Sequence, residues 1–192
     1  ENVENDERAE LFSLPNYINT MHENKWLGSK TGQGFYKKIK KEDGSSEIQT
    51  LDLNSMEYRA NKRASFSTLE MTKSIDNVAD RFPVLVKGKD KAGEFFRKNF
   101  AGLFAYVQNR IPEITDELYK IDDAMRAGYG WEHGPFQIWD AVGLEKGIEL
   151  MKAEGYEVAD WVAAMLSSGK DSFYTVKEGN TLYYDIPKKE YL

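Results

Sequence analysis

The sequence of 192 residues contains no cysteine and only two histidines. Without cysteine the chain has no disulfide framework, no thiol nucleophile and no thiolate-bound metal, which fits a reducing compartment. His22 lies at the end of a predicted helix, and His133 lies in a loop beside Glu132. Neither has an orienting partner of the kind that a catalytic histidine needs, so we expect structural roles for both.

An excess of positive charge is also missing. The chain has 26 basic and 32 acidic side chains, which gives a net charge of −6. Nucleic acid as a main partner would require a basic face that neutralises phosphates, so we expect no DNA or RNA partner. No apolar run has the length of a membrane span, and the acidic stretch 1–10 differs from a signal peptide. We therefore expect a cytoplasmic protein without a membrane span.

The composition that is present is that of a globular protein, with 41% hydrophobic and 30% charged residues. Apolar residues recur with helical spacing through most of the chain. This spacing predicts helices at 15–24, 90–108, 112–128, 135–142, 144–155 and 158–169. Alternating residues around turn sequences predict β-hairpins at 34–53 and 173–185. The predicted fold class is therefore all-α with short terminal β-hairpins.

The region between the first hairpin and residue 90 gives weaker signals. Residues 55–63 and 68–82 have some helical character, and residues 82–86 resemble a short extended piece. We expect this region to connect two better-defined parts of the chain.

Two parts of the chain are similar to one another. Tyr17 and Met21 align with Trp161 and Met165, and Ile18 aligns likewise with Val162. Each helix is followed by a loop, by the sequence Gly-Phe-Tyr (34–36) or Ser-Phe-Tyr (172–174), and by a hairpin. Two units of the same kind therefore end in the same way.

The repeat predicts how the chain is organised. In the second copy several helices precede the shared end, whereas the same helices of the first copy would lie before residue 1. We expect a segment of a longer polypeptide, with the tail of a first helical domain at 1–53, a connector at 54–89 and a second helical domain at 90–192.

The glycine-rich stretch "GSKTGQGFY" (28–36) could in principle bind phosphate. A Walker loop requires a glycine directly before the Lys-Thr pair, but Ser29 stands there. The dinucleotide fingerprint would require a third glycine where Lys37 stands. We therefore interpret Gly28, Gly32 and Gly34 as turn positions with positive φ.

Two stretches resemble the C-terminal helical domains of 3-hydroxyacyl-CoA dehydrogenases. They are "NKWLGSKTGQGFYKK" (24–38) and "NRIPEITDELYKIDDAMRAGYGWEHGPFQIWDAVG" (109–143). The residues that carry this resemblance are Gly28, Lys30, Thr31, Gly32, Gly34, Phe35, Tyr36, Arg110, Gly134, Pro135, Phe136 and Asp140. The resemblance implies a helical domain like the C-terminal domain of 6-phosphogluconate dehydrogenase.

The resemblance also implies an activity, namely oxidation of an L-3-hydroxyacyl-CoA to the 3-ketoacyl-CoA in fatty-acid β-oxidation, with NAD as the hydride acceptor. In that family the catalytic histidine, its glutamate and the NAD site belong to a Rossmann domain, and this sequence contains none of these. The implied partners are that Rossmann domain, the acyl-CoA substrate and a second copy in a homodimer. We expect no metal site and no activity in this segment on its own.

Two alternatives to this interpretation remain. The chain could be a free-standing helical interaction module without an enzymatic context. It could also come from another dehydrogenase with the same helical architecture, such as a 6-phosphogluconate type, although the stretch 109–143 speaks against that.

Asn109 is the one motif-matched candidate for a catalytic role. In the family, an asparagine at this point of the first helical copy hydrogen-bonds in the active site, whereas Asn109 falls in the second copy. The alternative that we favour is a buried asparagine that bridges helices or caps a helix starting at Pro112.

Other candidates have structural explanations that we favour. Asp122 and Asp123 could suggest a metal, but adjacent helical positions diverge, so a solvated face or an ion pair with Arg126 is expected. Asp140 is expected to cap or to pair across the repeat. The phenylalanines of 95–104 could form an acyl-chain slot, although their spacing predicts core packing.

Overall fold

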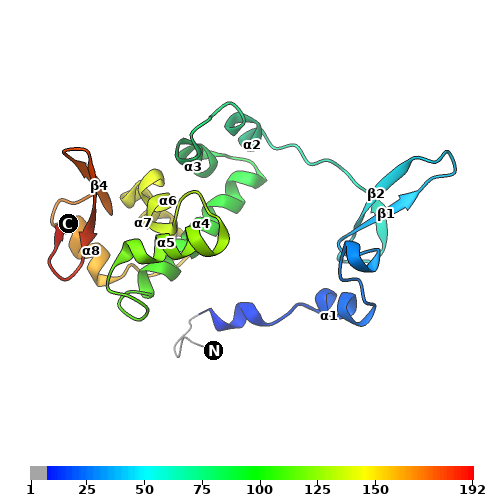
Figure 1. Cartoon of the computed structure of the whole chain (residues 1–192), viewed down its shortest axis with the longest axis horizontal. Helices are drawn as coiled ribbons and strands as arrows, with labels where there is room; N and C mark the ends of the chain where they lie inside the picture. Colours follow the sequence, from blue (N-terminus) through cyan, green and yellow to red (C-terminus); the bar gives the residue numbers. More distant parts are fainter. Residues whose placement is uncertain (1–7) are drawn as a thin grey trace. The chain divides into compact units, whose positions relative to one another are not determined.

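The computed structural model describes residues 8–192, and the chain divides into two compact units between Ala64 and Ser65. The expected polar stretch 1–10 lies mostly outside the described residues. The predicted combination of helices with small antiparallel strands is confirmed (Figure 1). The boundary between the two units lies within the predicted connector 54–89.

The first unit combines short helices with a small sheet. Its elements are the 3₁₀-helix η1 (Ala9–Phe12), α1 (Asn16–Glu23), the 3₁₀-helix η2 (Ser29–Thr31), β1 (Tyr36–Lys40), β2 (Ser46–Leu51) and β3 (Tyr58–Ala60). The strands form an antiparallel sheet in the order β1-β2-β3. The predicted hairpin is present, and a third strand extends it.

The helix predicted at 55–63 is wrong, because the third strand occupies part of this range. Asp52 organises a tight turn after β2, because its carboxylate accepts a hydrogen bond from the N–H of Asn54 over 3.0 Å. Met56, which has a φ of 57°, donates its N–H to the carbonyl of Asp52 over 2.8 Å. The chain therefore reverses, and Tyr58 pairs with Leu51.

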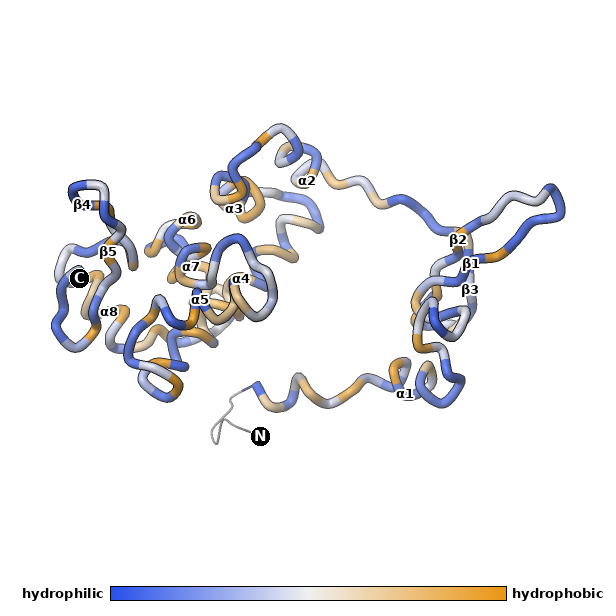
Figure 2. The backbone as a smooth tube through the Cα atoms, viewed as in Figure 1, coloured by the Kyte–Doolittle hydropathy of each residue, from blue (hydrophilic) through white to orange (hydrophobic). Residues whose placement is uncertain are grey.

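The second unit contains most of the helices. Its elements are α2 (Ser67–Thr72), α3 (Val78–Lys87), α4 (Lys91–Asn109), α5 (Leu118–Tyr129), α6 (Pro135–Val142), α7 (Leu144–Ala153), α8 (Asp160–Ser167), β4 (Tyr174–Lys177), β5 (Asn180–Asp185) and β6 (Glu190–Tyr191). The strands form an antiparallel sheet in the order β4-β5-β6. Figure 2 shows that hydrophobic and hydrophilic stretches alternate along the helices, as amphipathic packing requires.

The core of the second unit is centred on α4 and α6. The rings of Phe104 and Trp139 stack with centroids 4.8 Å apart, and both side chains are fully buried. The Trp139 indole N–H donates to the carbonyl of Leu144 over 3.1 Å. Gly147 leaves room for this indole, since an added Cβ would lie 2.0 Å from Nε1 of Trp139. Burial of such large aromatic groups is a main stabilising contribution.

The prediction of an extended piece at 82–86 is wrong, because these residues lie in α3. Asn77 caps this helix by accepting a hydrogen bond from the N–H of Ala79. Leu85 and Val86 are buried, and α3 packs on α4 and α6. Burial of the apolar face outweighs the unfavourable Pro83 inside the helix.

The helix predicted to open at Pro112 begins instead at Leu118. After α4 the chain makes a turn in which the N–H of Ile114 donates to the carbonyl of Arg110 over 2.9 Å. The Thr115 hydroxyl then accepts the N–H of Glu117, the residue before α5. Side-chain hydrogen bonds of this kind favour turns over helix.

Asp90 joins α2 to the start of α4. Its carboxylate accepts hydrogen bonds from the N–H and the hydroxyl of Thr68 over 2.9 and 2.7 Å, and from the N–H of Gly93 over 3.0 Å. These hydrogen bonds, from Thr68 first, hold the pKa of Asp90 far below its usual range. The carboxylate therefore fixes α2 against α4.

Candidate functional site

The candidate site is the point where a helix, a loop and a sheet meet, and it occurs twice. We call it the Phe-Tyr junction: the first junction contains Phe35 and Tyr36, and the second contains Phe173 and Tyr174. In the first junction α1 precedes β1, and in the second α8 precedes β4. The motif residues of the glycine loop and of α6 are found at these junctions.

The two junctions share their ring packing and their strand register. Tyr17 contacts Phe35 with ring centroids 6.5 Å apart, and Trp161 contacts Phe173 at 5.8 Å. The carbonyl of Phe35 accepts the N–H of Leu51 over 2.8 Å, and that of Phe173 accepts the N–H of Tyr184 over 2.8 Å. Aligned positions of the repeat therefore make equivalent contacts.

The third strands add another shared contact. The Tyr58 hydroxyl donates to the carbonyl of Gly34 over 2.7 Å, and the Tyr191 hydroxyl donates to the carbonyl of Ser172 over 2.7 Å. The turns that lead into these strands also agree, because Met56 and Lys189 both have a φ of 57°. The similarity seen in the sequence therefore extends through the whole sheet.

The second junction is covered by α6. Phe173 is fully buried, with ring centroids 5.0 Å from Phe136 and 5.0 Å from Trp139. Asp140 accepts the backbone N–H groups of Phe173 and Tyr174 over 2.7 and 2.8 Å. Through these two hydrogen bonds, Asp140 fixes the start of the sheet to α6.

Asp122 is the second carboxylate at this junction. It accepts the N–H groups of Phe136 and Gln137 at the start of α6, over 2.9 and 3.1 Å, and the hydroxyl of Tyr174 over 2.9 Å. Its side chain is 1% exposed. Asp123 lies on a solvated face, as predicted, and pairs with Arg126 over 3.3 Å. The same prediction is wrong for Asp122.

Burial shifts the titration of both carboxylates. Loss of solvation raises the pKa of Asp122 to about 6 and that of Asp140 to about 7, although their hydrogen bonds oppose this. The negative charge of Asp122 further raises the pKa of Asp140. In this arrangement each carboxylate accepts two backbone N–H groups.

Gly134 and Pro135 allow α5 and α6 to approach closely. A Cβ added at Gly134 would lie 2.3 Å from the Cα of Asp122. Pro135 occupies the first turn of α6, where a missing N–H costs nothing. The Gly-Pro-Phe motif therefore brings Phe136 over the second junction.

The glycine loop of the first junction closes on itself. The N–H of Gly28 donates to the carbonyl of Gln33 over 2.9 Å, and the Thr31 hydroxyl accepts the N–H of Leu27 over 3.0 Å. Gly28 and Gly32 have φ values of 114° and 86°, as expected. Loop amides that donate to carbonyls of the same loop do not form a phosphate cradle.

Two further residues of the glycine loop are Gly34 and Lys30. The positive φ expected at Gly34 is wrong, because this glycine is required for space: an added Cβ would lie 2.8 Å from the Cα of Gly28. Lys30 lies in η2 with an exposed side chain.

Asn109 is the last residue of α4, and its side chain is exposed. The expectation that it is buried between helices is wrong. Gln108 has that role instead: its amide donates to the carbonyl of Glu157 over 2.8 Å and accepts the N–H of Ala159 over 2.9 Å. The apolar spacing gave no signal for this buried glutamine, which is 1% exposed.

Arg110 follows Asn109 and is almost fully buried. Its guanidinium lies 4.5 Å from the ring centroid of Tyr106 and 3.2 Å from the carboxylate of Glu113. It lines an apolar groove of about 600 Å³ between α4 and α5. The other residues that line this groove are Leu103, Tyr106, Val107, Ile114, Thr115, Lys120, Ile121, Ala124, Met125 and Pro135.

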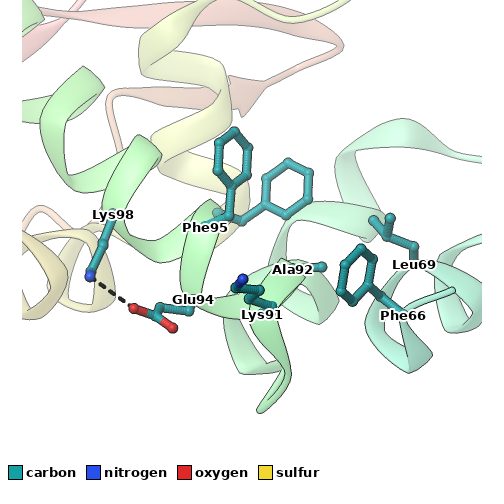
Figure 3. Close-up of a pocket in the computed structure, with 8 residues that line it drawn as sticks. Phe66, Leu69, Lys91, Ala92, Glu94, Phe95 and Lys98 are labelled. Carbon is teal, nitrogen blue, oxygen red and sulfur yellow. Dashed lines mark hydrogen bonds and ion pairs between the residues drawn. The ribbon is translucent and has the colours of Figure 1, made fainter. Parts of the chain in front are cut away.

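The phenylalanines of α4 divide between the core and a second groove. Phe100 and Phe104 are buried in the core, as the spacing predicts. Phe95 is exposed and lines an apolar groove of about 520 Å³ together with Phe66 and Leu69 of the region around α2 (Figure 3). Lys98 and Glu94 form an ion pair at its edge over 2.8 Å (Figure 3).

The two histidines differ in their surroundings. His22 is exposed near the end of α1. His133 packs against Phe82, with ring centroids 6.0 Å apart, and its Nε2 lies 3.9 Å from Glu132. Within residues 8–192, no group of three or more acidic or histidine side chains is placed to hold a metal. In the same range, no helix is both long and apolar enough to cross a bilayer.

Comparisons with known proteins identify the relatives of this chain. A probable 3-hydroxyacyl-CoA dehydrogenase of Bacillus subtilis (strain 168) is 34% identical over 183 residues, which is 95% of this chain and 22% of that protein. A putative fatty acid oxidation complex trifunctional enzyme of Rickettsia felis is 26% identical over 136 residues, 70% of this chain and 17% of that protein. A protein of the same description from Rickettsia prowazekii is 21% identical over 133 residues, 69% of this chain and 17% of that protein.

The chain therefore spans about a fifth of the length of these relatives. No family model matches the chain, and no solved structure matches it. The resemblance to the 3-hydroxyacyl-CoA dehydrogenases is confirmed, and it is a resemblance to one region of a larger enzyme.

Proposed function

We propose that this chain is the C-terminal helical region of an NAD-dependent L-3-hydroxyacyl-CoA dehydrogenase of fatty-acid β-oxidation. The observation that carries the proposal is the similarity to the Bacillus subtilis protein, which covers 95% of the chain and so includes both junctions. The names of the relatives support an oxidoreductase of which this chain is one part. The cytoplasm is the compartment expected for such an enzyme.

The role proposed for this region is structural support of the catalytic part. Its helices pack on a Rossmann domain elsewhere in the polypeptide, which binds NAD and supplies the acid-base group for hydride transfer. The aromatic core, the buried Asp122 and the partly buried Asp140 of the second junction suit this role, because they hold helices and sheet rigidly. We assign the second unit a fold like the helical domain of 6-phosphogluconate dehydrogenase.

The groove between α4 and α5 is the surface that we assign to the acyl-CoA cleft or to a dimer interface. It is lined mainly by apolar side chains such as Leu103, Ile121 and Met125, with Arg110 and Lys120 among them. An apolar groove with cations suits an acyl chain attached to an anionic group. Asn109, which precedes Arg110, matches the family's active-site asparagine, but the role that we favour for it is structural.

The test compares the full-length polypeptide with the isolated 192-residue chain. NAD reduction is measured with L-3-hydroxyacyl-CoA substrates of several chain lengths. We expect turnover by the full-length protein and none by the isolated chain, because the NAD site and the catalytic histidine belong to the other domain. Hydride transfer by the isolated chain, or a full-length protein that turns over no 3-hydroxyacyl-CoA, would contradict the proposal.

A further inference from the structure

The first junction has an apolar face that its counterpart does not expose. Phe35 is 44% exposed, whereas the equivalent Phe173 is 0% exposed. Beside Phe35 lies a groove of about 250 Å³ between α1 and the glycine loop. Its lining includes Ile18, Met21, Trp26 and Leu27.

We propose that this face is the docking site for a helix like α6, contributed by the part of the same polypeptide that precedes residue 1. The helix places apolar side chains against Phe35 and a carboxylate against the N–H groups of Phe35 and Tyr36. The proposal is independent of the enzymatic function, because it is argued from the internal repeat.

The backbone of the first junction is arranged to receive a carboxylate. Tyr36 pairs with Thr50, and the N–H of Leu51 donates to the carbonyl of Phe35. This makes Tyr36–Thr50 a non-hydrogen-bonded pair, so the N–H of Tyr36 points away from β2. The equivalent N–H of Tyr174 donates to Asp140. Within residues 8–192, no carboxylate accepts the N–H groups of Phe35 and Tyr36.

The second junction shows what the occupant must contain. On α6, Phe136, Trp139 and Asp140 lie three and four positions apart, so they share one face of the helix. The two rings cover Phe173, and the carboxylate accepts both N–H groups. An unpaired buried N–H is costly, so a cover of the first junction must also supply an acceptor.

The repeat also locates the occupant along the chain. Tyr17 precedes its counterpart Trp161 by 144 positions. The same offset places the counterpart of Asp140 a few residues before Glu1. The relatives are long enough to contain such a segment, because this chain spans 22% of the Bacillus subtilis protein.

The first experiment measures amide hydrogen exchange at Phe35 and Tyr36 in the 192-residue chain and in the full-length polypeptide. We expect exchange at least tenfold slower in the full-length protein. We further expect this protection to disappear when the acidic residue at the predicted upstream position is replaced by its amide. The amides of Phe173 and Tyr174, which Asp140 holds in both proteins, are the internal control.

The second experiment uses the absence of cysteine. A single cysteine is introduced as Leu27→Cys, at an exposed side chain that lines the groove, and its rate of thiol labelling is measured in both proteins. Lys30→Cys, on the exposed η2, is the matched control. We expect labelling of Leu27→Cys to slow in the full-length protein and labelling of Lys30→Cys to stay the same.

Three results would overturn the proposal. One is an upstream sequence without an acidic residue near the predicted position. Another is equal protection in the two proteins, which would mean that the face stays open or is covered within the 192-residue chain or by a second copy. The third is slow exchange at Phe35 and Tyr36 that persists after the upstream acidic residue is replaced by its amide, which would mean that a different surface covers the first junction.

Discussion

The hydroxyl of Tyr174 donates a hydrogen bond to Oδ2 of Asp122 over 2.9 Å and so links β4 to α5. Its counterpart in the first junction, Tyr36, is exposed. The two tyrosines occupy the same position of a repeated structure but differ in burial. The chain therefore contains its own control for the contribution of this hydroxyl.

Tyr174→Phe removes that hydrogen bond and leaves a buried carboxylate with one donor fewer. Hydrogen bonds to charged groups contribute about 1.5–3 kcal/mol, and we expect a loss of this size in the free energy of unfolding, measured with urea near pH 7. Tyr36→Phe is the control, and its effect should be within about 0.5 kcal/mol. Equal effects of the two substitutions would show that the Asp122 contact contributes nothing.

Gly134→Ala tests the close approach of α5 and α6. The added Cβ would lie 2.3 Å from the Cα of Asp122, so the helices must separate. We expect destabilisation by more than about 2 kcal/mol, of the kind caused by overpacking. Gly128→Ala in α5 is the matched control, because a Cβ there meets no atom within 4 Å. It should stabilise the chain by up to about 1 kcal/mol through helix propensity, and the opposite signs are readily distinguished by thermal unfolding.

Asp122, which is buried, and Asp140, which is partly buried, predict a dependence of stability on pH. Burial raises the pKa of Asp122 to about 6 and that of Asp140 to about 7, above the unfolded value of 3.8. The folded state therefore binds more protons between pH 4 and 7, and these groups make the chain less stable as pH rises through that window. We expect urea unfolding to show this decrease between pH 4.5 and pH 8, on the order of 1–3 kcal/mol per carboxyl.

Asp140→Asn should flatten that pH dependence, because it removes one of the two titrating groups. The exposed Asp123→Asn should reduce the slope far less, because the charge of Asp123 makes only a small contribution to the raised pKa of Asp122. Asp90 does not add to this slope, because its pKa lies below the usual range. Its contribution to the free energy of unfolding is lost only as pH falls below about 4. A slope that Asp140→Asn does not alter would contradict the assigned shift.

Gln108→Ala tests the glutamine that ties α4 to the segment before α8. Removing its amide leaves the carbonyl of Glu157 and the N–H of Ala159 without these partners. We expect a loss of about 2–4 kcal/mol in the free energy of unfolding, because buried unsatisfied groups are costly. Asn109→Ala, at the adjacent exposed position, should cost less than about 1 kcal/mol. A larger effect at Asn109 than at Gln108 would reverse this assignment.

Much of the fold follows from local sequence patterns. The apolar spacing located α1, α4, α6, α7 and α8, and turn sequences located both hairpins. These elements were predictable because their hydrophobic periodicity, their turn residues and their tertiary packing agree. The repeat was visible for the same reason, since both copies bury a methionine of the last helix, Met21 and Met165.

The features that the sequence did not reveal depend on contacts between distant residues. Burial against α4 and α6 makes a helix of 82–86 in spite of Pro83. Asp122 and Gln108 are buried because they meet backbone groups 14 to 51 positions away. Gly34 is a glycine because Gly28 lies close to it in space. A single sequence contains no local signal for any of these contacts.

The most direct test of the central claim is the mass of the native polypeptide in its source cells, measured with an antibody against this chain followed by intact mass spectrometry. The account predicts a protein several times larger than 22.0 kDa, because relatives are about five times longer than the region they share with it. A native product of 22.0 kDa would contradict the account and favour a free-standing helical interaction module.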